Sequence, residues 1–224
     1  MAVFFDFDST IVSKETLDEA IALALLGHPE RGHIVKEIED ITRLGMEGKL
    51  DFTESVRRRL AVIPLSKKQL EETGRAMTQA LAPGMKEVFS WLRERGHATY
   101  IVSGGFEECI LPVAEILETP RERVLSNRFT FSEDGMVSGV DESSLLWTKD
   151  GKAPALRAMR TRHPDEQFVM IGDGMNDYRA YESGAADMFV GFGMYAIRET
   201  VKAKAPFYAY TMNELQSVLT KIVV

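Results

Sequence analysis

Four groups of polar residues have types and spacings that suit chemistry on an anionic substrate. Asp6 and Asp8 lie two residues apart, and paired carboxylates can bind a hard divalent cation or serve as nucleophile and general acid. A serine and two glycines fill positions 103–105, where a hydroxyl and open backbone amides can hold charged oxygens. Lys152 adds a positive charge, and residues 172–177, Gly-Asp-Gly-Met-Asn-Asp, add further oxygen ligands. Because the net charge is −7, an anionic substrate would need a local positive site, which a divalent cation supplies.

Each group also has an ordinary structural explanation when it is taken alone. An aspartate that follows a strand often only orders a turn, and Ser-Gly-Gly is often a tight turn. A lysine such as Lys152 is usually solvated, and Asp173 could merely order its own glycine-rich turn. All four explanations would have to hold together, in this order along the chain, which favours a functional site instead.

The elements that must position these residues alternate between strands and helices. Apolar, β-forming runs predict buried strands, and polar groups follow three of these runs directly. Helical periodicity fills the stretches between them, so we predict an α/β fold with a doubly wound, Rossmann-like, mostly parallel sheet. Ligands of such sheets bind beyond the carboxyl ends of the strands. The predicted strands are 2–5, 98–102, 168–171 and 188–190, the predicted helices run over 85–95 and from residues 106, 152 and 212, and 124–131 with 136–140 form a hairpin around Asp134 and Gly135.

Residues 16–80 depart from this alternation, because they show helical periodicity without a convincing strand. Thr16 with Glu19 forms a capping-box pattern that predicts the start of one helix, and Asp51 and Ser66 are predicted to cap two more. The sequence therefore predicts a helical cap inserted after the first strand. The predicted domains are an α/β core of residues 1–13 and 82–224 and a cap of residues 14–81.

In combination the four groups resemble the motifs of the haloacid dehalogenase superfamily of phosphatases. That family carries Asp-x-Asp-x-Thr, a serine or threonine after the second strand, a distant lysine, and Gly-Asp-x-x-x-Asp. Residues 6–10, Asp-Phe-Asp-Ser-Thr, match the first motif, Ser103 the second and residues 172–177 the fourth. For the third, Lys149 and Lys152 are both candidates, and Lys152 is favoured because it begins an amphipathic segment. The resemblance implies a Mg²⁺-dependent phosphomonoester hydrolase that forms an aspartyl phosphate.

The resemblance also implies a role for each residue of the site. Asp6 would be the nucleophile, and Asp8 would protonate the leaving oxygen and later take a proton from water, which requires a raised pKa. Mg²⁺ would be held by Asp6, Asp173 and the backbone carbonyl of Asp8, and Asp177 would support these ligands from behind. The phosphate would be held by Ser103, Gly104, Lys152 and Asn176.

The helical insert resembles that of the phosphoserine phosphatases within this family. By that resemblance Glu15 would bind the substrate ammonium and Arg59 its carboxylate, and Met46 and Phe52 would form an apolar wall. A zwitterion needs one anion and one cation, and a guanidinium suits a carboxylate. The competing interpretation makes Glu15 a first-turn acid, Arg59 part of a solvated helix face and the two apolar residues part of the core. The segment 141–147 differs from the expected pattern, so its tryptophan either shapes the mouth of the site or packs in the core.

Three other functions fit part of the sequence. Hydrolysis of another small phosphomonoester, or phosphoryl transfer from phosphoserine to an alcohol such as homoserine, would use the same motifs. A receiver-type signalling module also uses aspartates, Ser or Thr, Lys and Mg²⁺, but it carries its phosphorylated aspartate on a later strand than its acidic pair and has no helical lid. A catalytically inactive binding protein is disfavoured because every expected polar group is present.

Composition narrows the class of protein. Apolar residues make up 45% and charged residues 27% of 224 residues, as in soluble globular proteins, and the net charge of −7 argues against nucleic acid or an anionic membrane as partner. The expected partner is a small phosphorylated metabolite, with phosphoserine favoured. The one cysteine, Cys109, excludes an intrachain disulfide and is expected to be buried in a helix. Without a signal-peptide pattern or a membrane-length apolar run, the expected location is the cytoplasm.

Overall fold

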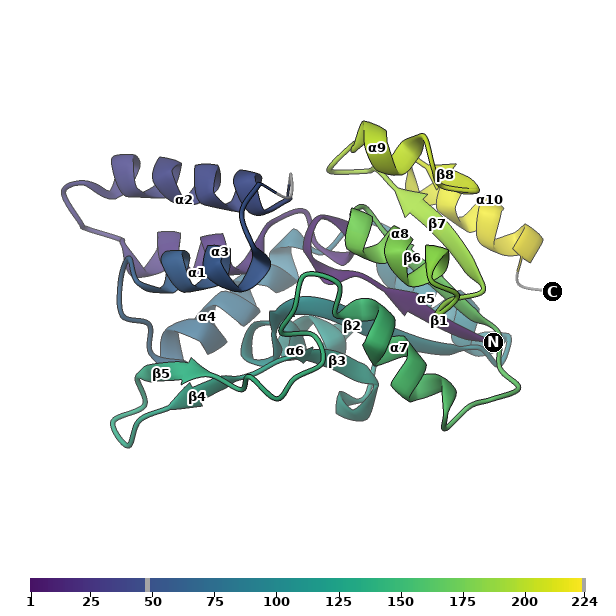
Figure 1. The fold of residues 1–224 in the computed structure, drawn as a ribbon, viewed down its shortest axis with the longest axis horizontal. Coiled ribbons are helices and arrows are strands. Elements are labelled where there is room, and N and C mark those ends of the chain that lie inside the picture. The colour runs from purple at the N-terminus through teal and green to yellow at the C-terminus, as the bar shows by residue number, and fades with distance from the viewer. Residues whose placement is uncertain (47–48, 223–224) are drawn as a thin grey trace.

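A parallel six-stranded sheet forms the centre of the protein, in a computed structural model that describes residues 1–46 and 49–222 (Figure 1). The strands lie in the order β3-β2-β1-β6-β7-β8, and every neighbouring pair is parallel. The first strand is central and the order reverses beside it, which is the doubly wound arrangement that the sequence predicts. The strands are β1 (Ala2–Phe5), β2 (Ala98–Phe106), β3 (Val124–Asn127), β6 (Phe168–Gly172), β7 (Met188–Phe192) and β8 (Phe207–Ala209).

Helices cover both faces of this sheet. Successive strand residues point to opposite faces, so Val3 and Phe5 pack with α5, α6 and α10, while Ala2 and Phe4 pack with α7 and α8. The four helices predicted after the insert are confirmed. Among the described residues, no helix is long and apolar enough to cross a membrane. The helices are α5 (Met85–Glu94), α6 (Glu107–Ile116), α7 (Lys152–Arg160), α8 (Met175–Glu182), α9 (Glu199–Lys202) and α10 (Met212–Ile222).

The register of the sheet brings the polar groups of the sequence to one edge. Phe5 lies opposite Ile101 on one side and Ile171 on the other, so the residues after these positions share the carboxyl edge. The predicted second strand is too short. In the structure it continues through the Ser-Gly-Gly group to Phe106, because Phe106 still pairs with β3 beyond an irregularity.

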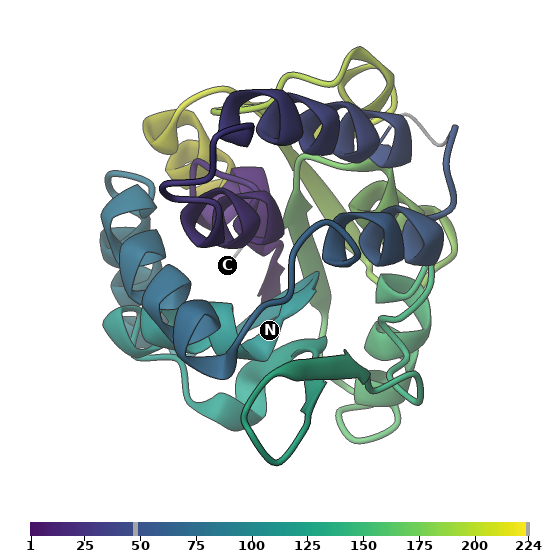
Figure 2. The same cartoon turned by 90° about the vertical axis from the view of Figure 1, so that its left-hand side faces the viewer.

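Four helices follow the first strand and lie beyond the carboxyl edge of the sheet (Figure 2). Asp51 accepts hydrogen bonds from the amides of Thr53 and Glu54, and Ser66 forms a capping box with Gln69, so both of these predicted caps are confirmed. The helices are α1 (Thr16–Ala24), α2 (Arg31–Met46), α3 (Phe52–Leu60) and α4 (Lys67–Met77).

The capping box predicted at Thr16 is wrong. Helix α1 has Glu15 at its N-cap position and no side-chain cap, and the amide and hydroxyl of Thr16 both donate to Asp8. Asp8 is a largely buried carboxyl group, and a buried polar group without hydrogen bonds is more costly than a helix end without a cap. The needs of the site therefore override the local capping preference.

The predicted hairpin begins later than expected, because residues 124–131 do not form one strand. The chain leaves the main sheet after β3 and forms a separate antiparallel pair. This hairpin is bonded to the start of α4: the Lys67 amide donates to the Gly135 carbonyl at 2.9 Å, and the Val137 amide donates to the Leu65 carbonyl at 2.8 Å. The strands of the hairpin are β4 (Phe129–Phe131) and β5 (Val137–Val140).

Gly74 sets how closely α4 approaches α6. A Cβ at this position would lie 2.9 Å from Pro112 Cγ and 3.0 Å from the carbonyl oxygens of Glu108 and Cys109. These carbonyls belong to the backbone of a helix and cannot move aside, so Gly74→Ala should lower the free energy of unfolding by about 1–3 kcal/mol. Urea unfolding followed by circular dichroism measures the change.

Gly32→Ala is the matched control for this prediction. Gly32 also lies in a helix, α2, but a Cβ there has no atom within 4 Å. Its replacement should leave stability unchanged or raise it by up to about 1 kcal/mol, because alanine loses less backbone entropy on folding. Equal destabilisation by both changes would show that close packing on α6 is not the cause.

Candidate active site

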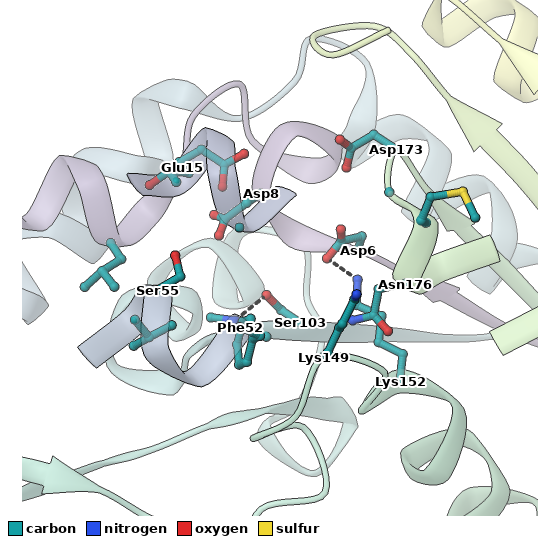
Figure 3. Close-up of a pocket in the computed structure, with 18 of the residues that line it drawn as sticks. Asp6, Asp8, Glu15, Phe52, Ser55, Ser103, Lys149, Lys152, Asp173 and Asn176 are labelled. Carbon is teal, nitrogen blue, oxygen red and sulfur yellow. Dashed lines mark hydrogen bonds and ion pairs between the residues drawn. The ribbon is translucent and has the colours of Figure 1, made fainter. Parts of the chain in front are cut away.

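A cavity of about 350 Å³ lies at the carboxyl edge of the sheet. The sheet and the loops that follow its strands form one wall, and the helices after β1 form the other (Figure 3). Asp177 lies behind this surface, and the side chain of Met46 falls outside the part of the chain that the structure describes. The predicted site residues that line the cavity are Asp6, Asp8, Glu15, Phe52, Arg59, Ser103, Gly104, Lys152, Asp173 and Asn176.

The turn after β1 directs two aspartates into this cavity. Asp6 follows the strand, and its Oδ1 accepts a hydrogen bond from the Phe7 amide at 2.7 Å. Asp8 has extended backbone angles and Ser9 has a φ of 54°, within a turn whose other residues are helical. The chain leaves strand geometry here, and both aspartates line the same cavity. A left-handed serine is a strained conformation of the kind found at functional sites.

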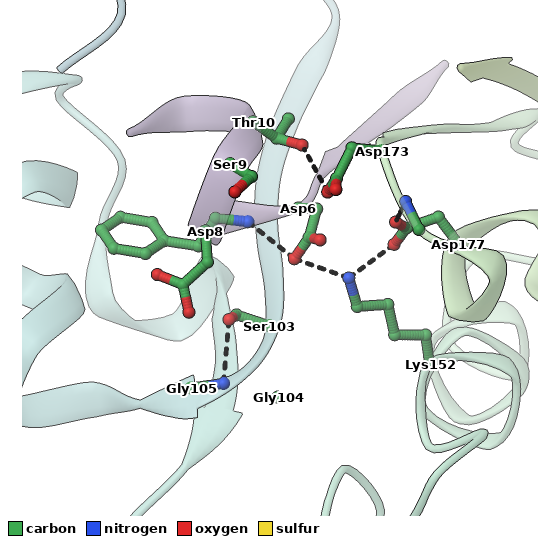
Figure 4. A network of polar contacts seen from close by, with 12 residues as sticks. Asp6, Asp8, Ser9, Thr10, Ser103, Gly104, Gly105, Lys152, Asp173 and Asp177 are labelled. Carbon is green, nitrogen blue, oxygen red and sulfur yellow. Dashed lines mark hydrogen bonds and ion pairs between the residues drawn. The ribbon is translucent and has the colours of Figure 1, made fainter. Parts of the chain in front are cut away.

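A buried lysine lies between two of the aspartates (Figure 4). Lys152 Nζ is 2.6 Å from Asp6 Oδ1 and 2.5 Å from Asp177 Oδ1. Burial by itself would lower the pKa of Lys152, but the two adjacent carboxylates outweigh it and raise that pKa, so the ammonium stays charged. Lys149 also lines the cavity, but it is Lys152 that contacts the proposed nucleophile.

Three carboxylates form a compact cluster that could hold a metal ion. Oxygens of Asp6, Asp173 and Asp177 lie within 4.8 Å of one another. Burial raises the pKa of Asp173, although the neighbouring Arg198 opposes it, and raises the pKa of Asp177 to about 7. Carboxylates this close and this buried repel each other, which suits a hard divalent cation. The carboxylate of Asp8 stands outside this cluster and accepts from Thr16.

The Ser-Gly-Gly segment and the Gly-Asp turn approach the aspartates closely. Ser103 Oγ accepts a hydrogen bond from the Gly105 amide at 2.9 Å, which orients the hydroxyl at the end of β2. Asn127 donates to the Gly104 carbonyl at 2.8 Å and so holds this peptide in place. At Gly172 a Cβ would lie 2.2 Å from Asp177 Cγ, so only glycine permits that carboxylate to sit there.

Two further acids near the cavity have strongly raised pKa values. Burial raises the pKa of Asp8 to about 7, and the negative charge of Asp6 adds to the effect. Burial and the charge of Asp8 raise the pKa of Glu15 to about 8, although Ser9 donates to its carboxylate at 2.8 Å. An aspartate that carries a proton near neutral pH can serve as a general acid, as the sequence analysis requires of Asp8.

The wall opposite the sheet carries the predicted cap residues. Arg59 is 8% exposed, with Nη1 2.9 Å from Asp18 and Nε 3.3 Å from the Ser55 carbonyl, so it is not part of a solvated helix face. Trp147 is buried and meets the ring of Phe52 edge-on at 5.8 Å. Of the two interpretations of Trp147, packing in the core describes its place, and it packs against the ring of Phe52, which lines the cavity.

The sequence matches the haloacid dehalogenase-like hydrolase family over residues 3–182. The chain belongs to that family. Phosphoserine phosphatase of Homo sapiens is 32% identical over 214 residues, which cover 96% of this chain and 91% of the human protein. A phosphoserine phosphohydrolase-like protein from Francisella tularensis subsp. tularensis SCHU S4 has a crystal structure that matches with a TM-score of 0.86 at 32% identity, over 97% of this chain and 99% of that one. A structure of a phospho-aspartyl intermediate analogue of phosphoserine phosphatase matches with a TM-score of 0.79 at 26% identity, over 98% of this chain and 97% of that one.

Three residues that contact the predicted site residues were not identified as part of the site in the sequence analysis. Arg198 lines the cavity between β7 and α9, and its Nε is 2.7 Å from Asp173 Oδ2. No motif marked Arg198, and its one signal is a basic residue shortly after a predicted strand. Asn127 and Thr16 were missed for a different reason. Their hydrogen-bond partners, Gly104 and Asp8, come close to them only in the folded structure.

The buried acids predict how the stability of this hydrolase depends on pH. The folded-state pKa values of Asp8 and Asp177 are raised to about 7 and that of Glu15 to about 8. Each group keeps its proton in the folded state at pH values where the unfolded chain has lost it. With a chelator present, Tm should therefore fall as the pH rises between about pH 5 and pH 8.

Asp8→Asn isolates one of these groups. The variant removes a titrating carboxylate, so its Tm should fall less steeply over the same range. In terms of unfolding free energy, the slopes of the two proteins should differ by up to about 1.4 kcal/mol per pH unit. Burial lowers the pKa of His97, which acts in the opposite direction in both proteins and cancels in the comparison. Identical slopes for the two proteins would contradict a raised pKa at Asp8.

Proposed function

We propose that this hydrolase converts O-phosphoserine to serine and phosphate through an aspartyl phosphate on Asp6, with Mg²⁺ as cofactor. The observation that carries the proposal is the make-up of the cavity: Asp6 and Lys152 line one side, and Glu15 and Arg59 line the other. Phosphoserine has a phosphate for the first pair, and an ammonium and a carboxylate for the second. The pKa of Glu15 is raised to about 8 in the empty cavity, and an ammonium bound beside it would favour its ionised form. The phosphoserine phosphatases among the relatives support the same substrate.

In the first step, a carboxylate oxygen of Asp6 attacks phosphorus. The Phe7 amide and Lys152 both contact Oδ1, so these contacts orient the carboxylate and leave Oδ2 as the attacking atom. The bond from phosphorus to the serine oxygen breaks, and Asp8 transfers its proton to that oxygen, which leaves as the serine hydroxyl. Ser103 and the Gly104 amide would hold the phosphoryl oxygens while charge shifts between the two bonds.

In the second step, water releases the phosphate. Asp8 is now a carboxylate and takes a proton from a water molecule that attacks phosphorus. The bond between Asp6 and phosphorus breaks, which returns Asp6 to its free form and Asp8 to its protonated form. The raised pKa of Asp8, about 7, suits both directions of proton transfer near neutral pH.

The residues present fit Mg²⁺. Asp6, Asp173 and Asp177 offer only oxygen ligands, and their mutual repulsion is relieved by a cation. Asp6, Asp173 and the backbone carbonyl of Asp8 would hold the ion, with Asp177 behind them. When bound, Mg²⁺ neutralises charge between the carboxylates and the substrate phosphate.

We also propose that residues 14–81 act as a cap on a core of residues 1–13 and 82–224. The two segments that join them lie side by side, since Val12 and Leu81 form an isolated bridge and the Ala82 amide donates to the Ile11 carbonyl at 2.9 Å. We propose a cytoplasmic location because the one cysteine, Cys109, is a buried free thiol, as suits a reducing compartment.

The nucleophile can be tested by replacing Asp6. Asp6→Asn should abolish turnover and prevent formation of a beryllofluoride adduct, because an amide does not attack phosphorus. Asp8→Asn is the comparison: it keeps the nucleophile, so it should still form the adduct while losing about 10²–10⁴-fold in kcat. Release of phosphate and serine in equal amounts is the activity readout. Turnover by Asp6→Asn at the normal rate would rule out Asp6 as the nucleophile.

Metal removal tests the cofactor. Treatment with a chelator should stop turnover, and added Mg²⁺ should restore it, because the carboxylate cluster and the phosphate dianion repel each other without a cation. A thiolate-seeking metal such as Cd²⁺ should restore less activity than Mg²⁺, since the cluster offers only oxygen atoms. Full activity in a metal-free preparation would refute the proposed metal site.

Arg59→Ala tests the choice of substrate. The change should lower kcat/KM for phosphoserine by about 30-fold or more, because a desolvated carboxylate loses its charged partner. An aryl phosphate, which has no carboxylate, should be hydrolysed with little change. Arg59→Lys keeps the charge but not the two-pronged geometry, so it should recover only part of the loss.

Arg58→Ala is the matched control for this test. Arg58 is the next residue of α3, but its side chain is 55% exposed and pairs with Glu54 at the surface. Replacing it with alanine should leave kcat/KM unchanged for both phosphoserine and the aryl phosphate. Equal losses on both substrates in Arg59→Ala would mean that Arg59 serves folding of the helices rather than recognition of a carboxylate.

A further inference from the structure

Behind Arg59, outside the cavity, lies a carboxylate that the proposed reaction does not use. Asp18 of α1 is not among the residues that line the cavity, and its side chain is 16% exposed. Its Oδ1 is 2.9 Å from Arg59 Nη1 on α3 and accepts a second hydrogen bond, also of 2.9 Å, from the Thr42 hydroxyl on α2. One oxygen atom therefore joins three helices of the insert.

The contacts of Arg59 fix the plane of its guanidinium. Nη1 contacts Asp18, and Nε donates to the Ser55 carbonyl at 3.3 Å, one turn earlier in α3. With these two nitrogens held by groups on different helices, the side chain cannot turn about its long axis without breaking one contact. A guanidinium has five N–H groups, so the hydrogens not used by Asp18 and Ser55 remain for a ligand.

We propose that Asp18 is the positioning residue of the carboxylate subsite: it keeps Arg59 buried and correctly oriented before the substrate arrives. The proposal rests on the proposed function, because it assigns Arg59 to the substrate carboxylate. It concerns selectivity among substrates, and Asp18 does not touch the substrate.

The energetic argument compares the empty and the occupied cavity. Arg59 is 8% exposed, and a buried cation without an anionic partner is costly. Asp18 supplies that partner while the cavity is empty, so the guanidinium does not have to leave toward solvent and return. An arginine already held in its binding orientation loses less entropy when the ligand binds, which lowers KM for a carboxylate-bearing substrate.

Thr42 adds a geometric condition to this arrangement. Thr42 lines the cavity, and its hydroxyl donates to the same oxygen that Arg59 contacts. Asp18 therefore has both of its contacts only while α2 is packed against α1. The carboxylate subsite is complete when all three helices are assembled, and selectivity depends on that assembly.

The test compares two substrates that differ by one carboxylate, O-phosphoserine and O-phosphoethanolamine. The measured quantity is the ratio of their kcat/KM values in the wild type and in Asp18→Ala, Asp18→Asn, Arg59→Ala and the double variant Asp18→Ala/Arg59→Ala. We expect Asp18→Ala to lower the ratio by about 10-fold or more, mainly through KM for phosphoserine. Asp18→Asn keeps an acceptor oxygen for Arg59 and Thr42 but removes the negative charge, so it should also lower the ratio, by less than Asp18→Ala does.

The double variant separates positioning from other effects. If Asp18 acts through Arg59, then Asp18→Ala should not change the ratio further once Arg59 is alanine. Glu54→Ala is the matched control, because it breaks an exposed carboxylate–arginine pair on α3, and it should not move the ratio. Should Asp18→Ala fail to fold, Asp18→Asn in the wild-type and Arg59→Ala backgrounds gives the same comparison with a smaller expected effect.

The outcomes distinguish this inference from the proposed function. A ratio lowered by Arg59→Ala but not by either Asp18 variant would overturn the inference and leave the proposed function standing. Additive losses in the double variant would also overturn it, because Asp18 would then act without Arg59. An unchanged ratio in Arg59→Ala would remove Arg59 from recognition of the substrate carboxylate, and with it both the support for phosphoserine as the substrate and the role of Asp18.

Discussion

The confinement of negative charge beside the central strand is the constraint on which the rest of the structure depends. Asp6, Asp173 and Asp177 place oxygens within 4.8 Å of each other in a space largely closed to water. Lys152 and Arg198 offset part of the repulsion, and burial, with a smaller contribution from the neighbouring carboxylates, still raises the pKa values of Asp173 and Asp177. A site with this excess of negative charge is prepared for a cation, and through the cation for a phosphate.

Much of the fold and of the core site could be predicted from the sequence, because local signals and the rules of parallel sheets agree there. Short apolar runs followed by polar groups identify β1 and β6, and parallel strands bring their carboxyl ends to one edge. When β1 and β6 are neighbours in the sheet, Asp6 and Asp173 must lie near each other, although 167 positions separate them in the chain. Lys152 could be chosen over Lys149 because it begins a helix, and the structure places it against Asp6.

The parts that could not be predicted depend on choices between competing partners. Thr16 has the sequence of a helix cap, but a buried carboxylate eight residues earlier takes its hydrogen bonds. Arg198 and Asn127 lie in no motif, and their partners come from strands and turns that only folding brings near. The end of β2 was placed too early because the pairing of Phe106 with β3 overrides the turn preference of two glycines. Local sequence describes what a residue can do, and tertiary structure decides which of these options it takes.

The hairpin β4–β5 has a mechanical consequence for the helical insert. The insert joins the core not only through its two chain connections but also through backbone hydrogen bonds from Lys67 and Val137, and α4 packs on α6 at Gly74. Helix α4 is thus clamped at its start and along its length. An opening that kept these contacts intact would leave α4 on the core and require α1–α3 to move relative to it, at the expense of the packing between α1 and α4.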